Sequence, residues 1–254
     1  MLIFRVVLGH PARAPVRTSL STALMFVIVA DLAAAQPAPP LPPPRPSEAP
    51  SPVVSPPAAA EASEPATHDG CLPRLKSSGF DVEAAEQPST SNESCRIANP
   101  VRLRAVPVPS RREVTVRLGE QPVLACRFAE TFGHWIGDLV APVIAGSLQT
   151  ELKAVRTGPG FACRNRNGAA TGKLSAHAEG LAIDIAAFEL ANGSTLRVEP
   201  EMDAPPDPAL AALRTAACGW FTTVLGPGSD EAHKDHLHVD IQQHGSSDRY
   251  RICQ

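Results

Sequence analysis

The sequence lacks several features that define large classes of proteins. Its 23 Lys and Arg residues occur singly or in pairs, so they form no basic face of the kind that binds a nucleic-acid backbone. None of its six Cys residues lies in a C-x-x-C pair, which argues against a Cys-type zinc ribbon. The sequence also has no internal repeat. We therefore expect no nucleic-acid partner and a fold built around a single core.

The amino terminus has the pattern of an export signal. Arg5, Arg13 and Arg17 precede an apolar run over residues 20–30, and a series of small alanines ends at Ala35. The run is too short to span a bilayer comfortably. We predict a signal peptide over residues 1–35, which is either cleaved or retained as an anchor. After cleavage we expect no stable membrane span.

Proline is concentrated in one segment. Twelve of the 27 prolines lie between Pro37 and Pro65, where no aromatic residue occurs. Such a segment has almost nothing to bury and favours polyproline II, so we predict a disordered, Pro-rich spacer over residues 36–69. It would act as a linker, or as a tether that holds the following domain away from a membrane or threads it through a polymer mesh.

All six Cys follow this spacer, between Cys71 and Cys253. An even number of Cys in an exported chain indicates disulfides formed in an oxidising compartment. We predict three bridges, although fifteen pairings are possible and the sequence does not select among them. Because Cys71 and Cys253 lie at the two ends of residues 70–254, we expect the bridges to hold the termini of one folded domain.

Hydrophobic patterning predicts an α+β domain over residues 70–254, with a small antiparallel sheet and helices packed on one of its faces. Predicted strands cover residues 101–106, 113–118, 181–187 and 237–241. Predicted helices cover residues 124–139 and 143–155, with Pro142 between them, and a third segment that begins with Asp207 as N-cap and ends at Gly226.

Ionisable residues gather in the last two predicted strands. Asp184 lies between two alanines on one face of its strand, and His236 and His238 share a face of theirs. His177 precedes Asp184 by seven residues, so the two can bind one ion only if the chain turns between them, which Gly180 permits. Two imidazoles and one carboxylate form a known catalytic zinc set that leaves the fourth position for water.

The segment from Ser175 to Asp184, SAHAEGLAID, resembles the S-x-H-x-x-G-x-A-x-D signature of zinc D-alanyl-D-alanine peptidases. The later H-x-H is similar to the second half of the site in lysostaphin-type enzymes and LD-endopeptidases, which share the Hedgehog/DD-peptidase fold. A closer match over residues 70–254 is the bacterial extensin-like C-terminal family, through the Cys-Arg before LSAHAEGLAIDI, TVLGPGSD and HKDHLHVD. The resemblance implies a Hedgehog/DD-peptidase-like fold in a bacterial envelope protein.

Residue by residue, the resemblance implies that His177, Asp184 and His238 bind Zn²⁺. It also implies a general base, for which there are two candidates. The carboxypeptidase branch has Glu three residues before the last His, where this chain has the shorter Asp235, whereas the endopeptidase branch has a His at the position of His236. Side chains alternate along a strand, so His236 shares the face of His238, whereas Asp235 does not. This favours His236 as the base.

Other polar residues have less specific assignments. The resemblance implies that His233 and Arg164 stabilise an oxyanion or position the substrate, although Arg164 could also be a surface arginine beside a disulfide. Glu179 and Asp240 could orient a ligand imidazole or be ordinary exposed charges. Four histidines without partners in the pattern are expected to be incidental or structural: His10, His68, His134 and His244.

We therefore expect an exported zinc metallopeptidase of the periplasm or cell envelope that hydrolyses an amide in peptidoglycan stem peptides or cross-links. Two alternatives come from the same residues. The domain could be a zinc-containing module that binds the wall without hydrolysis, or a structural envelope protein whose domain docks on the wall.

Overall fold

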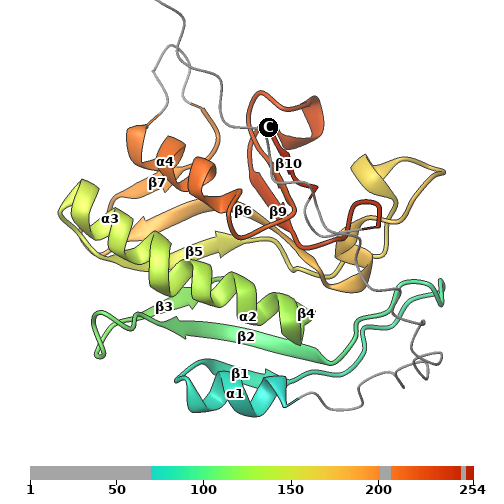
Figure 1. The fold of residues 1–254 in the computed structure, drawn as a ribbon, viewed down its shortest axis with the longest axis horizontal. Coiled ribbons are helices and arrows are strands. Elements are labelled where there is room, and N and C mark those ends of the chain that lie inside the picture. Colours follow the sequence, from blue (N-terminus) through green and yellow to red (C-terminus); the bar gives the residue numbers. More distant parts are fainter. Residues whose placement is uncertain (1–69, 201–206, 247–249) are drawn as a thin grey trace, which may run out of the picture. The chain divides into compact units, whose positions relative to one another are not determined.

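A computed structural model describes residues 70–200, 207–246 and 250–254 of the chain. The predicted signal peptide and the Pro-rich spacer lie outside these residues. Within them, strands and helices combine in an α+β arrangement built on one mixed sheet (Figure 1). No helix in these ranges is long and apolar enough to cross a membrane.

The sheet has ten strands, in the order β1-β2-β3-β5-β6-β9-β8-β10, with β4 paired to β2 and β7 paired to β6. Its strands are β1 (Asp81–Ala84), β2 (Pro100–Pro107), β3 (Thr115–Leu118), β4 (Val123–Ala125), β5 (Leu152–Thr157), β6 (Ala182–Leu190), β7 (Thr195–Arg197), β8 (Thr223–Leu225), β9 (Leu237–Asp240) and β10 (Ile252–Cys253). Two pairs, β3 with β5 and β8 with β10, are parallel. The predicted sheet was therefore too small, because several short strands carry too little alternation to be recognised. It was also predicted to be antiparallel throughout, whereas two strand pairs are parallel.

The helices are α1 (Cys71–Ser77), α2 (Cys126–His134), α3 (Ala141–Leu148) and α4 (Pro208–Ala217), with a π-helical segment η1 (Trp135–Val140) and short 3₁₀ turns η2 (Arg166–Gly168), η3 (Ala176–Glu179) and η4 (Glu231–His233). α2, η1 and α3 form one continuous rod across the sheet (Figure 1). Pro142 does not separate two helices as predicted. It lies within the rod, at the second residue of α3 and directly after the π-helical segment η1.

The aromatic core joins this rod to the carboxyl-terminal half of the domain. Phe128, Phe132 and Trp135 are completely buried, and Phe128 and Trp135 both contact the buried ring of Phe221. The adjacent Trp220 is only partly buried. Buried aromatic rings of this size contribute strongly to the stability of a hydrophobic core.

Two predicted helices end earlier than the sequence indicated. Gln149 ends α3 in the left-handed conformation (φ 52°), and the residues that follow form β5 between β3 and β6. The third helix begins at the predicted Asp207 cap, whose carboxylate accepts a hydrogen bond from the Ala209 N–H, but it ends at Ala217, and β8 follows. In both cases pairing with distant strands outweighs apolar spacing that also fits a helix.

The prediction of three bridges is confirmed, and the structure gives the pairing that the sequence left open: Cys71–Cys126, Cys95–Cys163 and Cys218–Cys253. The first joins α1 to α2, and the last joins the end of α4 to β10, so both termini of the domain are held as expected. The second bridge ties the segment before β2 to the loop that carries Arg164.

Gly180 makes the turn that the sequence required between His177 and Asp184. It follows η3 with φ 65°, and a Cβ atom at this position would lie 2.8 Å from the backbone nitrogen of Ala125. A side chain is therefore excluded both by the backbone conformation and by the space around it.

Gly180→Ala should lower the free energy of unfolding by about 2 kcal/mol or more, since the left-handed conformation alone costs about 1–2 kcal/mol with a Cβ atom. The matched control is Gly146→Ala in α3, where no atom lies within 4 Å of the added Cβ. The control should leave stability unchanged or raise it by up to about 1 kcal/mol. Urea unfolding of the oxidised proteins measures both, and equal stability of the two variants would contradict the placement of Gly180.

Candidate metal centre

The candidate site lies on β6 and β9, which pair antiparallel (Figure 1). Asp184 is directly opposite His238, and the adjacent residues Ile183 and Val239 are opposite each other. Ile183 and Val239 are completely buried in the hydrophobic core. Because side chains alternate along a strand, Asp184 and His238 point together to the other face of the sheet.

His177 reaches the same place from η3. The hydroxyl of Ser175 accepts a hydrogen bond from the His177 N–H at 3.4 Å, which caps this short turn. His177 Nε2 then lies 3.2 Å from Asp184 Oδ1 and 3.2 Å from His238 Nδ1, while His238 Nδ1 lies 2.8 Å from Asp184 Oδ1. These three side chains therefore form a compact group that could hold a metal ion.

In each imidazole, the outer nitrogen, which is the one turned away from the other two side chains, contacts an acceptor. His177 Nδ1 is 2.6 Å from the carbonyl oxygen of Gly160, which can only accept a hydrogen bond, so Nδ1 donates. His238 Nε2 is 3.2 Å from Oδ2 of Asp240. Burial opposes ionisation of Asp240, but its hydrogen bonds and the nearby charge of His238 together outweigh burial and lower the pKa of Asp240. An ionised Asp240 also accepts, so His238 Nε2 donates to it.

The centre of the group is consequently lined by lone pairs. Neutral imidazoles that donate through their outer nitrogens present only acceptors at His177 Nε2 and His238 Nδ1, beside the carboxylate oxygen of Asp184. Three acceptors this close repel one another unless a proton or a metal cation lies among them.

Proton binding to the metal-free protein reflects the same electrostatics. Burial opposes the charged form of His238, but hydrogen bonds to Asp184 and Asp240 raise its pKa to about 9. Burial also opposes ionisation of Asp184, yet hydrogen bonds from His177 and His238 hold the pKa of Asp184 well below its ordinary value. At neutral pH the metal-free protein therefore has a protonated His238 beside an ionised Asp184.

His236 faces this group from the residue before β9. Its Nε2 lies 3.6 Å from Asp184 Oδ1, and its Nδ1 lies 2.8 Å from Asp235 Oδ1. The side chain of Asp235 is 55 % exposed and contacts Nδ1 of His236, whereas Nε2 of His236 is the nitrogen near Asp184. The structure therefore brings the two candidate bases together, with His236 nearer to the carboxylate of Asp184.

Arg164 and His233 also lie beside the group. Arg164 Nη2 is 3.7 Å from Asp184 Oδ2. His233 is buried, its ring centre is 5.5 Å from that of His238, and its Nδ1 lies 2.6 Å from Asp230 Oδ1. Burial lowers the pKa of His233, and the hydrogen bond to Asp230 offsets this only in part. A neutral His233 that donates to Asp230 presents Nε2 as an acceptor.

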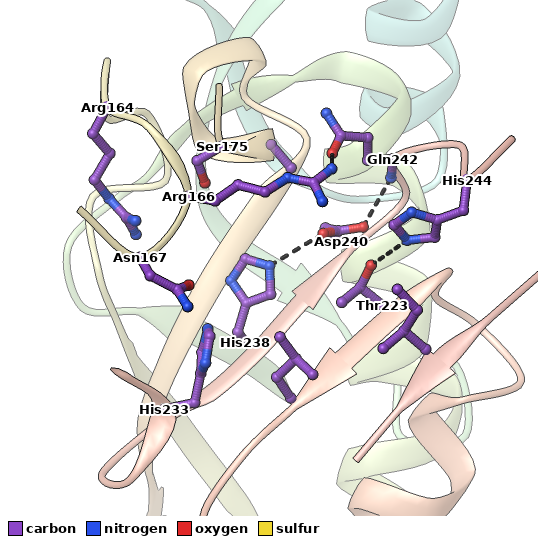
Figure 2. Close-up of a pocket in the computed structure, with 13 residues that line it drawn as sticks. Arg164, Arg166, Asn167, Ser175, Thr223, His233, His238, Asp240, Gln242 and His244 are labelled. Carbon is purple, nitrogen blue, oxygen red and sulfur yellow. Dashed lines mark hydrogen bonds and ion pairs between the residues drawn. The ribbon is translucent and has the colours of Figure 1, made fainter. Parts of the chain in front are cut away.

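A cavity of about 110 Å³ adjoins the group on the side of His238 (Figure 2). His233 and Arg164 both line this cavity. The other lining residues are Arg166, Asn167, Ser175, Ala176, Thr223, Leu225, His238, Asp240, Gln242, His244 and Ile252. Arg166 spans part of the cavity and donates to Oε1 of Gln242 at 2.6 Å (Figure 2). His177, Asp184 and His236 do not line this cavity, so it borders the group without enclosing it.

Several of these residues were missed or undervalued in the sequence. Arg166 and Gln242 carry no motif, because loops distant in the chain bring them together. His244, expected to be incidental or structural, lies 2.7 Å from Thr223 Oγ1 and lines the cavity. Of the two residues expected to orient an imidazole or to be exposed charges, Asp240 contacts His238, whereas Glu179 forms no hydrogen bond or ion pair within the described ranges.

The fold and the site together define a disulfide-linked α+β protein with a buried His-Asp-His group. A model of the family described as "Extensin-like protein C-terminus" matches residues 69–254, and the chain belongs to this family. The family resemblance found in the sequence is thereby confirmed. No curated protein and no solved structure matches the chain.

Proposed function

We propose that the domain is an exported zinc peptidase that hydrolyses an amide bond in peptidoglycan stem peptides or cross-links. The observation that carries the proposal is the convergence of three acceptors, His177 Nε2, Asp184 Oδ1 and His238 Nδ1, within 3.2 Å of one another. Because both imidazoles donate through their other nitrogen, a cation satisfies all three acceptors at once.

The donor set fits zinc. Ligands at bond lengths of about 2.0–2.1 Å in a tetrahedral site lie roughly 3.3 Å apart, close to the separations of 2.8–3.2 Å between these atoms. Every Cys within the described residues is in a disulfide, so no thiolate competes as a ligand. Three protein ligands leave one position open, which is typical of catalytic sites; zinc bound there supplies Lewis-acid polarisation of a carbonyl and lowers the pKa of water to about 7.

We assign the proton transfers to His236. Its Nδ1 donates to Asp235, so Nε2 is free to accept a proton from the attacking water and to pass it to the leaving amine. Asp235 acts through His236 by fixing the orientation of the imidazole. Arg164, which lies beside Asp184, would bind the polarised carbonyl oxygen. His233, whose ring centre is 5.3 Å from that of His236, would position the substrate by accepting a hydrogen bond from it.

The substrate class rests on chemistry and compartment. Arg164 and Arg166 both line the cavity beside the site, and stem peptides of peptidoglycan carry carboxylates that suit these guanidinium groups. The predicted signal peptide and the disulfides support a location in the periplasm or envelope, where this polymer lies. We further propose that the domain is a variant of the Hedgehog/DD-peptidase fold, in line with the SAHAEGLAID signature.

Purified protein incubated with cross-linked muropeptides should generate new amines, detected by mass spectrometry. Chelation should stop the reaction and added zinc should restore it. His177→Ala and His238→Ala should each abolish both stoichiometric zinc binding and turnover, while the disulfides keep the domain folded. His134→Ala is the matched control, because His134 pairs with Asp138 on the helical rod and should not affect zinc.

The outcomes separate the alternatives. Bound zinc without cleavage of any muropeptide would overturn the peptidase and favour a zinc-containing wall-binding module. Protein without zinc and without cleavage would favour a structural envelope protein. Stoichiometric zinc in His177→Ala or His238→Ala would contradict the ligand assignment itself.

His236→Ala should retain zinc and lose at least about 100-fold in turnover, the usual scale for a general acid or base. Asp235→Asn should lose less, because the amide oxygen can still accept a hydrogen bond from His236 Nδ1. Turnover on a cross-linked muropeptide, with zinc content determined for each variant, makes the comparison. A larger loss in Asp235→Asn would transfer the role of general base to Asp235.

A further inference from the structure

Asp240 is a buried carboxylate at the end of β9. It lies two residues after His238 on the same face of the strand and is only 5 % exposed. Its partner in β6 is Ala182, whose small side chain leaves room for the carboxylate. A buried charge of this kind is costly unless it is paired and hydrogen-bonded, so its contacts define its role.

The two oxygens of Asp240 have different partners. Oδ1 accepts a hydrogen bond from the Gln242 N–H at 2.9 Å and lies 3.2 Å from Thr222 Oγ1. Oδ2 lies 3.2 Å from His238 Nε2 (Figure 2). The backbone of Gln242 therefore fixes the carboxylate independently of the imidazole, and the carboxylate in turn fixes the imidazole.

This arrangement selects one tautomer of His238. A neutral imidazole carries its hydrogen on either nitrogen, and only the Nε2–H form leaves Nδ1 available as a ligand. The hydrogen bond to Asp240 favours that form, whereas the carbonyl of Gly160 favours the opposite tautomer in His177. The two imidazoles consequently face the centre through different nitrogens.

Asp240 also contributes charge to the site. Asp184 and Asp240 place two carboxylates on either side of His238, and a divalent cation bound to two neutral imidazoles would offset their charge. The guanidinium of Arg164 lies 3.7 Å from Asp184 Oδ2 but is 39 % exposed, so water screens its charge, and the guanidinium of Arg166 donates to Gln242.

We infer that Asp240 is a positioning residue of the metal centre: it holds His238 with Nδ1 toward the ion and adds a negative charge close to the cation. The inference rests on the zinc site of the proposed function and not on hydrolysis. Carboxylates that bind ligand imidazoles in this way typically change metal affinity 10–100-fold.

Two substitutions test the carboxylate in steps. Asp240→Asn removes the charge and leaves one acceptor oxygen for two N–H donors, those of His238 and Gln242, and should weaken zinc binding about 10-fold. Asp240→Ala removes both the charge and the acceptor and should weaken it by up to about 100-fold. Asp230→Asn is the matched control, since Asp230 makes the same kind of contact with His233, which is not a proposed ligand. Competition with a chromophoric chelator measures the zinc affinity of each protein.

A second measurement distinguishes positioning from a general loss of structure. In the zinc-loaded wild type, ¹⁵N NMR of the imidazoles should show His238 protonated at Nε2 and metal-bound at Nδ1. In Asp240→Ala the Nε2–H signal should broaden by exchange with water, while the imidazole signals of His134, remote from the site, should be unchanged.

Wild-type zinc affinity in both Asp240 variants would overturn the inference while leaving the peptidase proposal intact. Absence of zinc from the wild type would overturn both. Weakened binding in the Asp240 variants, in a protein that cleaves no muropeptide, would overturn only the hydrolysis.

Discussion

The register between β6 and β9 is the constraint on which the candidate site depends. Ile183 and Val239 are fixed opposite each other by burial in the core, and this places Asp184 opposite His238 on the other face. Because side chains alternate, a slip of β9 by one residue would turn His238 into the hydrophobic core and Val239 out of it. The hydrophobic effect thus holds two of the proposed ligands in register whether or not a metal is bound.

The remaining parts of the site are attached to this strand pair by specific local devices. Gly180 turns the chain so that His177 returns over Asp184, and the Gly160 carbonyl orients the imidazole of His177. The bridge Cys95–Cys163 anchors the loop next to Arg164. These supports draw together three acceptors whose mutual repulsion is tolerable only around a positive charge, which is a common way for a fold to prepare a cation site.

Much of this arrangement could be predicted from local sequence. Alternation marked β2, β3, β6 and β9, the spacing from His177 to Asp184 required a turn at Gly180, and the even number of Cys indicated three bridges. Local sequence failed where the outcome depends on distant partners. The apolar residues of β5 and β8 fit helical spacing equally well and become strands only because neighbouring strands pair with them. The contact of Arg166 with Gln242 joins loops 76 residues apart, which no local pattern marks.

The most direct test is a crystal structure of the zinc-loaded protein with anomalous data at the zinc absorption edge. The account predicts one strong anomalous peak about 2.0–2.2 Å from His177 Nε2, His238 Nδ1 and a carboxylate oxygen of Asp184, with His238 Nε2 directed at Asp240. A zinc ion held instead by His233 and His236, or bound to His238 through Nε2, would contradict it.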